Sequence, residues 1–226
     1  MSTLKWVRVA AAVAAAGLAV AACGTVQMGA AAITGNSRIS AATLTAQVAN
    51  LNTAYAADRA KGVKPQRAVG QETQQVLTWL ILFRVYDQLA SQHHIYVTPA
   101  QAQRQLDALT SQAASSKVSL DEYVSAGGAL PPDLVPQLGQ YFAILSELEG
   151  RFDAGKAPTT TAGQEKLQSE LGHAQCIASK DLGVTVNPQY GVWDYNTYSV
   201  VTAPPSLAAA PSPAPTASPA KTTPPC

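Results

Sequence analysis

One stretch of the sequence restricts the fold more than any other. Between residues 66 and 93, apolar side chains recur at helical spacing, and from Trp79 to Phe83 they cover every face of the expected helix. A helix that is apolar all round must be enclosed by other elements, so we expect this one to be the central helix of a helical domain. The apolar part is too short to cross a bilayer, and Arg84 and Asp87 follow it closely.

Signals for helix ends predict further helices on both sides of the central one. Thr98 precedes a proline and Gln101, and Ser119 precedes Glu122 at the same spacing, so each opens a capping box. We expect Gly127–Gly128 to end the helix that starts at Ser119. The predicted helices begin near residues 40, 66, 98, 119, 131 and 161, and the last one ends near residue 182.

Short extended segments lie at the two ends of this helical region. Residues 30–34 are followed by the turn pair Gly35–Asn36, and residues 184–186 alternate as a strand does. Isolated strands leave backbone groups unpaired, so we predict that residues 30–34 pair with a segment between residues 184 and 201. The expected fold is mainly α, with a small β pairing between its N- and C-terminal segments.

The first 23 residues indicate where the protein works. Lys5 and Arg8 precede an apolar run that ends in Val20-Ala21-Ala22-Cys23, and this order is typical of a secretory signal followed by a bacterial lipobox. We therefore expect cleavage after residue 22 and a diacylglyceryl group on the Cys23 thiol. The predicted location is the extracytoplasmic face of the cell membrane, held by lipid alone. An ordinary signal peptide or an uncleaved anchor is the alternative.

The last 24 residues have a different composition. Residues 203–226 contain eight of the 15 prolines and no glycine, mixed with Ala, Ser and Thr. This composition cannot bury a core and favours extended polyproline II, either as a spacer or glycan-bearing stalk or as a plain disordered tail. The predicted organisation is thus a signal peptide (1–22), a lipidated linker (23–29), a helical domain (30–202) and a tail (203–226).

Three cysteines occur in the chain. With Cys23 carrying lipid, Cys176 and Cys226 remain in a compartment that permits oxidation. A disulfide between them would staple the tail to the domain, but nothing in the sequence sets its geometry. We therefore favour a buried, inert Cys176 and a solvent-exposed Cys226.

Composition and motifs exclude several functions. A net charge of +1 provides no basic surface for nucleic acid. The sequence has no serine-hydrolase, phosphate-loop or dinucleotide motif, so we expect no enzyme activity and no cofactor. Glu147 and Glu149 fall on different faces of their helix, which suits solvation better than acid–base catalysis.

The histidines do not complete a metal site. His93 and His94 are adjacent at a predicted helix end and point about 100° apart. His173 and Cys176 share a helical face, but no third ligand or catalytic group accompanies them. We expect exposure or a helix-end interaction for the first pair, packing for the second, and no bound metal.

Several segments together resemble a known family. They are Leu80-Ile81, Gln88-Leu89-Ala90 and Ile95-Tyr96-Val97-Thr98-Pro99-Ala100, with weaker similarity in Ala32-Ile33-Thr34-Gly35-Asn36. This pattern resembles the central helix, following turn and opening strand of SurA-type N-terminal domains. Residues 186–194, Val-Asn-Pro-Gln-Tyr-Gly-Val-Trp-Asp, are similar to the closing segment of actinobacterial lipoproteins with this domain, although Gln189 replaces the usual Arg.

The resemblance implies a chaperone-like protein for exported chains. In SurA-like and PrsA-like foldases a parvulin prolyl isomerase commonly interrupts the helical domain, but here predicted helices fill that interval. The family would bind non-native or extended segments of exported proteins in an apolar groove, for which Tyr86, Trp193 and Tyr195 are the candidate residues. Trp79 and Phe83 are expected in the core instead. The alternative is an adaptor or structural lipoprotein that holds one envelope protein.

Overall fold

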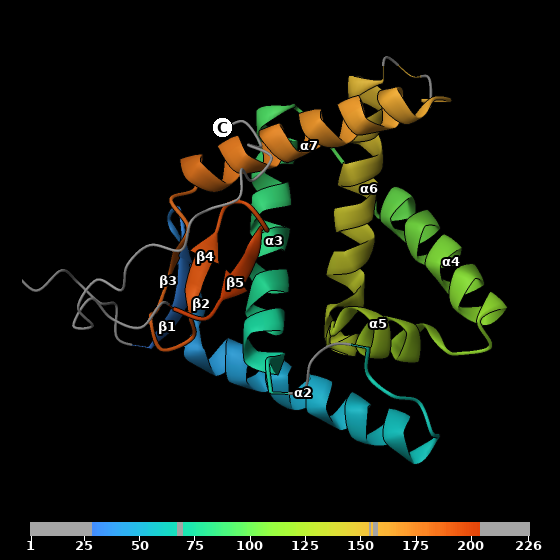
Figure 1. The fold of residues 1–226 in the computed structure, drawn as a ribbon, viewed down its shortest axis with the longest axis vertical. Coiled ribbons are helices and arrows are strands. Elements are labelled where there is room, and N and C mark those ends of the chain that lie inside the picture. Colours follow the sequence, from blue (N-terminus) through green and yellow to red (C-terminus); the bar gives the residue numbers. More distant parts are fainter. Residues whose placement is uncertain (1–28, 67–69, 154, 156–157, 204–226) are drawn as a thin grey trace, which may run out of the picture.

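The structure is a computed structural model that describes residues 29–66, 70–153, 155 and 158–203. The predicted signal peptide, Cys23, most of the linker and nearly all of the tail lie outside these residues. Within them the chain is mainly helical with a small antiparallel sheet, as predicted from the sequence. Figure 1 shows helices packed around a central helix, α3 (Glu72–Gln92), with strands along one side.

Helix α3 is the enclosed helix that the apolar pattern predicts. Leu77, Ile81 and Val85 have no exposed surface, and α2, α6, α7 and strands all contact the helix. The helix begins at Glu72, later than the predicted start near residue 66. Gly70 precedes it with a φ of +92°, a left-handed conformation that interrupts a right-handed helix. Its N–H donates to the Glu72 carboxylate.

Three helices begin at side-chain caps, at or near the starts predicted from the sequence. The Ser40 hydroxyl accepts a hydrogen bond from the Thr43 N–H at the start of α2 (Ala41–Ala60). Both predicted capping boxes are present, at α4 (Pro99–Ser115) and α5 (Leu120–Gly128). These local bonds satisfy N–H groups that have no partner within the first helical turn.

The end of α5 differs from the prediction. The helix runs through Gly127 and Gly128, and the residue in the left-handed conformation is Ala129, with a φ of +51°. Ala129 is fully buried, so tertiary packing holds a conformation that an alanine seldom adopts. Gly127 and Gly128 therefore do not end the helix, and both line a groove between α5 and its neighbours.

Two long helices complete the helical part. A short 3-10 helix, η2 (Pro132–Leu134), leads into α6 (Val135–Phe152), and α7 (Thr161–Asp181) starts with Thr160 as its cap. Figure 1 shows α7 lying across one end of α3 and α6. Between α4 and β3 the described residues form α5, η2, α6 and α7, in agreement with the helices predicted for this interval.

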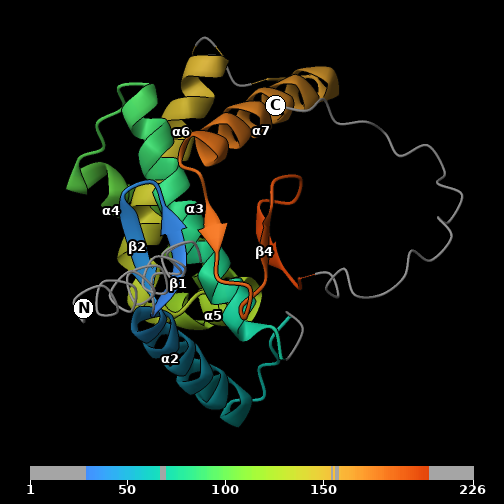
Figure 2. The ribbon, with the colours of Figure 1, turned by 90° about the vertical axis from the view of Figure 1, so that its left-hand side faces the viewer.

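The strands join the two ends of the domain. Strand β1 (Ala30–Thr34) lies between β2 (Ser37–Ser40) and β3 (Thr185–Val186), both antiparallel to it. The pairing of β1 with β3 confirms the predicted link between N- and C-terminal segments. The hairpin partner β2 is not predicted from the sequence. A second hairpin, β4 (Val192–Asp194) and β5 (Ser199–Val201), packs against α3 (Figure 2).

Buried side chains form two clusters. The main core surrounds α3 and includes residues of α2, α7 and both hairpins. The second cluster lies between α3, α5 and α6 and consists of Phe83, Val124, Leu130, Leu134 and Leu138. α3 contributes to both, so it joins the two halves of the domain.

No helix within the described ranges combines the length and the apolar character that crossing a membrane requires.

Candidate functional site

An apolar groove opens beside the second cluster. It has a volume of about 610 Å³ and lies between α3, α4, α5 and α6, and residues of the segment that follows α2 also line it. The apolar side chains that line it include Trp79, Leu109, Val118, Tyr123, Leu138 and Phe142. All but Leu138 are only partly buried, so they present apolar surface that the fold leaves open.

Trp79 forms the α3 side of the groove. Its indole N–H donates to the Gly128 carbonyl over 2.9 Å, and its ring packs against Phe83 and Tyr141 at centroid distances of 5.8 and 6.0 Å. These contacts hold the indole in one orientation while part of it faces the groove. A Cβ at Gly128 would lie 3.9 Å from the Trp79 ring, so the glycine leaves open space at the aromatic surface. We expected Trp79 in the core, and the structure places it at the boundary.

Helix α4 forms the outer side of the groove and packs closely on α6. A Cβ added at Gly139 of α6 would lie 2.8 Å from Leu106 Cγ and 2.9 Å from the Ala102 carbonyl oxygen. Only glycine permits this approach, because the Ala102 oxygen belongs to the backbone and cannot rotate away. Gly139 therefore sets how near α4 lies to α6, and hence the width of the groove.

A charged pair lies at the rim. Lys61 Nζ donates to the Glu122 carboxylate over 2.8 Å, and Glu122 also accepts from the Ser119 N–H in the capping box. The bond from Lys61, followed by those from Ser119, lowers the pKa of Glu122 to about 2. The same bond raises the pKa of Lys61. The rim therefore carries a balanced pair, and the exposed Lys64 also lines the groove.

A second hollow, of about 580 Å³, has a different character. It lies between the N-terminal half of α3 and the β4–β5 hairpin, and amide and hydroxyl groups such as Gln71, Gln75 and Ser199 dominate its lining. Thr78 and Gln74 already hydrogen-bond to Val200 and Thr202 across it. These bonds attach the hairpin to α3, so we take the apolar groove as the candidate site.

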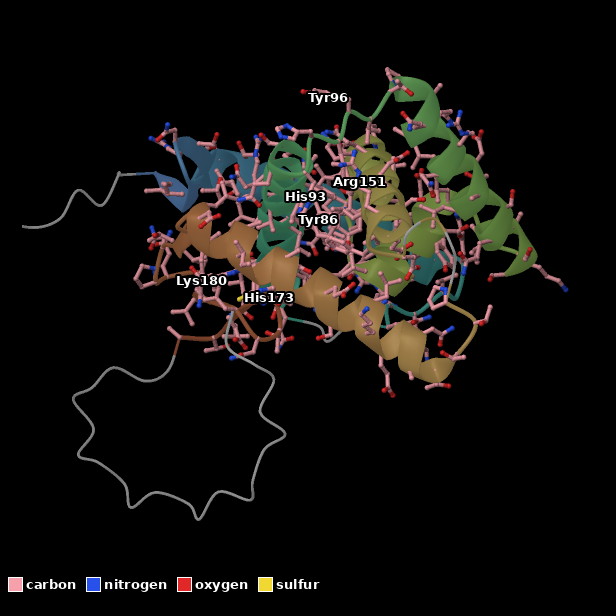
Figure 3. All side chains as sticks on the ribbon, turned by 90° about the horizontal axis from the view of Figure 1, so that it is seen from above. Tyr86, His93, Tyr96, Arg151, His173 and Lys180 are labelled. Carbon is pink, nitrogen blue, oxygen red and sulfur yellow. The ribbon has the colours of Figure 1, made fainter. Side chains whose placement is uncertain are left out.

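Tyr86, a predicted client-binding residue, lies in the main core. It is 5% exposed, and its ring centroid is 4.3 Å from that of Tyr141. Burial raises the pKa of Tyr86 well above its ordinary value. Figure 3 shows its side chain among the helices, whereas Tyr96, 85% exposed in the α3–α4 connection, stands clear of them. The structure therefore gives Tyr86 a packing position outside the groove.

The other two predicted client-binding residues belong to the C-terminal hairpin. Trp193, on β4, is 8% exposed and packs into the main core, and its indole N–H has no hydrogen-bond partner within the described part of the chain. Tyr195 is half-buried against the same core. Neither residue lines the groove, so the structure does not bring the three predicted residues together at that surface.

The histidines occupy separate positions. The carbonyl groups of His93 and His94 accept hydrogen bonds from the Arg151 guanidinium, and the His93 ring meets Phe152 edge-on. His173 is exposed on α7, as Figure 3 shows. Among the described residues, no group of three or more His, Cys, Asp and Glu side chains is arranged to hold a metal ion.

The preference for an inert thiol at Cys176 is wrong, because Cys176 is disulfide-bonded. The residue is 7% exposed and lies on α7. Nothing in the sequence sets the geometry of such a bond, so residue types alone did not favour it. A sulfur in a disulfide is also unavailable as a ligand or nucleophile beside His173.

Of the apolar side chains that form the groove, only Trp79 was singled out from the sequence, and it was assigned to the core. Trp79, Leu109 and Phe142 come from α3, α4 and α6 and meet only in the folded protein. One sequence signal was present. Gly127 and Gly128 carry no side chain beyond the backbone, so these two positions of α5 leave room for a neighbour at the groove.

Comparison with known proteins found no match to a protein-family model, to a curated protein or to a solved structure.

Proposed function

We propose that this protein is a lipid-anchored, extracytoplasmic chaperone-like protein that binds non-native apolar segments of exported proteins in the groove, without covalent chemistry. The observation that carries the proposal is the set of half-buried apolar side chains on four helices, which a folded domain would ordinarily cover. The resemblance to SurA-type domains supports the same function.

The shape and lining of the groove suit a segment of polypeptide. Its volume of about 610 Å³ has room for a few side chains. Apolar contact is not directional, so such a surface accepts many sequences, as a chaperone must. Gln66, Gln112 and Ser116 line it as well, and their amide and hydroxyl groups suit the unpaired backbone of an extended segment.

The proposed anchor would hold the groove near the membrane. Cys23 precedes Gly29, the first described residue, by six positions, which span about 20 Å when fully extended. Acyl chains on Cys23 would supply the attachment, since each buried CH₂ contributes about 0.8 kcal/mol. Mass spectrometry of the mature N-terminus tests this: a lipidated Cys23 supports the anchor, and an unmodified thiol rejects it.

A matched pair of variants tests the groove. Leu109→Glu places a carboxylate in the groove, and Ala108→Glu places the same charge on the exposed face of the same helix. The complete mature chain in nanodiscs is added to chemically denatured citrate synthase, and aggregation is followed by light scattering. We expect the parent and Ala108→Glu to suppress aggregation, and Leu109→Glu to lose most of that effect at equal helicity.

Two results would count against the proposal. No suppression by the parent at a several-fold molar excess would reject chaperone-like binding, and equal suppression by both variants would reject the groove as its site. Cross-linking in membranes then addresses the adaptor alternative: one stoichiometric partner favours an adaptor, and many weakly bound ones favour the chaperone. We also expect no turnover in a proline-peptide isomerisation assay.

A further inference from the structure

We infer that the second hollow, between α3 and the β4–β5 hairpin, binds a neutral saccharide beside the groove proposed for client segments. The hollow has a volume of about 580 Å³, within the range of about 300–1,000 Å³ that small-molecule sites occupy. Amide, hydroxyl, aromatic and aliphatic side chains line it, and none of the described residues in its lining is charged. The class of ligand follows from which of these groups the protein leaves free.

The neutral lining favours an uncharged ligand. An anion would meet no Lys or Arg side chain in the lining, and a metal ion would meet no carboxylate or imidazole ligand there. Glu72 directly follows Gln71 in the chain, but its carboxylate accepts a hydrogen bond from the Gly70 N–H over 2.9 Å. The hollow therefore has to recognise its ligand through hydrogen bonds between neutral groups and through packing.

Some polar groups of the hollow are already used to hold its two walls together. The Thr78 hydroxyl donates to the Gln74 carbonyl over 2.8 Å and accepts from the Val200 N–H over 2.9 Å. The Gln74 amide donates to the Thr202 hydroxyl over 3.3 Å. The bond from Val200 also occupies an N–H with which a further strand would pair on β5, so the hollow does not suit a peptide that binds by strand addition.

The α3 wall contributes amide groups that the protein does not use. The Gln75 side chain lines the hollow, and its Oε1 atom is buried without a hydrogen-bond partner among the described residues. A buried oxygen without a donor costs free energy, which a donor on a ligand would recover. Gln71 occupies the N-cap position of α3 but makes no side-chain cap bond, so its amide is available to donate and to accept.

The hairpin wall contributes an acceptor at Ser199. The Thr197 hydroxyl donates to Asp194 Oδ2 over 2.9 Å, and its oxygen lies 2.7 Å from Ser199 Oγ. Because Thr197 has one hydroxyl proton and Asp194 takes it, the Ser199 hydroxyl must donate to Thr197. The Ser199 oxygen thus keeps its acceptor capacity for a group in the hollow. Both walls therefore present acceptors that call for a ligand with several O–H or N–H donors.

Trp79 adds the apolar surface that a sugar ring also needs. A pyranose carries hydroxyl groups that donate and accept around its edge, and its C–H groups form an apolar face that packs on an aromatic ring. The indole lines the hollow and is held by its 2.9 Å hydrogen bond to the Gly128 carbonyl. A purely apolar ligand would leave Gln75 and Ser199 unpaired. Trp79 and Gly128 also line the groove, so a bound saccharide would lie next to a bound client segment.

Saturation-transfer NMR tests the inference on the complete mature chain in nanodiscs, with empty nanodiscs as the blank. The probes are maltose, cellobiose and trehalose, and digalacturonic acid is the charged control. We expect at least one of the neutral disaccharides to bind and the acid not to bind. Gln75→Ala and Ser199→Ala should each weaken binding about fivefold, since each removes one hydrogen-bonding group. Gln168→Ala and Ser169→Ala, at exposed positions of α7, should bind as the parent does.

Three results would overturn the inference: no binding of these disaccharides at up to about 10 mM, undiminished binding by both hollow variants at equal helicity, or equally strong binding of digalacturonic acid. Nanodiscs that contain diglucosyl diacylglycerol then identify the source of the sugar. Competition with the free disaccharide assigns the site to a lipid-borne saccharide, and no competition assigns it to a soluble one. Sugar binding by a protein that fails to suppress aggregation would reject the client proposal and support this inference alone.

Discussion

The two sides of helix α3 are closed to different degrees. Toward the sheet and α7, Leu77 and Ile81 are fully buried in the main core. Toward α5 and α6, Trp79 is only partly buried and faces an open groove. One helix, apolar on every face from Trp79 to Phe83, therefore serves both a sealed core and an exposed apolar surface. The elements packed against each side of α3 determine whether that side is sealed or open.

The largest expected effect is a truncation in the main core. Leu77→Ala should lower the free energy of unfolding by about 2–5 kcal/mol, because it leaves a cavity among fully packed neighbours. Leu109→Ala, in the half-buried groove wall, should lower it by only about 1 kcal/mol, since little packing is lost there. Urea denaturation measures both. Equal losses would mean that the groove is closed in solution.

The next effect concerns the approach of α4 to α6. Gly139→Ala should lower the free energy of unfolding by about 1–3 kcal/mol, because the new methyl meets Leu106 and the Ala102 carbonyl. Gly150→Ala, on the same helix with nothing within 4 Å, should raise it by about 0.5–1 kcal/mol. Thermal and chemical unfolding check the pair. A neutral Gly139→Ala would show that α4 is free to shift.

A buried polar contact next to the groove should matter less than these. The Ser125 hydroxyl, fully buried, donates to Asp58 Oδ2 over 2.7 Å and joins α5 to α2. Ser125→Ala should cost about 1–2 kcal/mol, because the buried carboxyl loses its donor. Ser111→Ala, at an exposed hydroxyl of α4, should change the free energy of unfolding by less than about 0.5 kcal/mol. Similar costs for both would contradict the contact.

The smallest effect is the response of the groove rim to acid. Folding lowers the pKa of Glu122 to about 2, mainly through Lys61, so its ionised form favours the folded state. This contribution is complete above the ordinary pKa near 4.5 and is lost as the pH falls from there to about 2. Melting temperatures of Glu122→Gln should therefore fall less over that range than those of the parent, whereas Glu165→Gln, exposed on α7, should follow the parent. Parallel curves for all three would reject the rim pair.

The elements that local chemistry controls were predictable. The caps at Ser40, Thr98 and Ser119 are formed within four residues of chain, and the structure contains all three. The all-round apolar pattern of α3 likewise required enclosure, whatever the neighbours. The pairing of β1 with β3 followed from the need of each strand for a partner.

The site was less predictable, because it depends on which elements meet. Tyr86 and Trp193 were aromatic candidates for binding, yet their neighbours bury them. Trp79 was assigned to the core, yet it is only partly buried and lines the groove, with Gly128 of α5 beside its ring. Side-chain type is the same in a core and in a groove, so sequence pattern does not distinguish them.

By itself the sequence determined the helical class, the start of most helices, the central position of α3 and the link between the two ends of the domain. Each of these follows from contacts within a few residues or from an apolar surface that must be covered. Only the tertiary structure decided how closely α4 approaches α6 at Gly139 and which aromatic rings remain exposed in the groove. It also decided that Cys176 is in a disulfide. These features depend on distances between segments far apart in the chain, and residue types alone do not contain those distances.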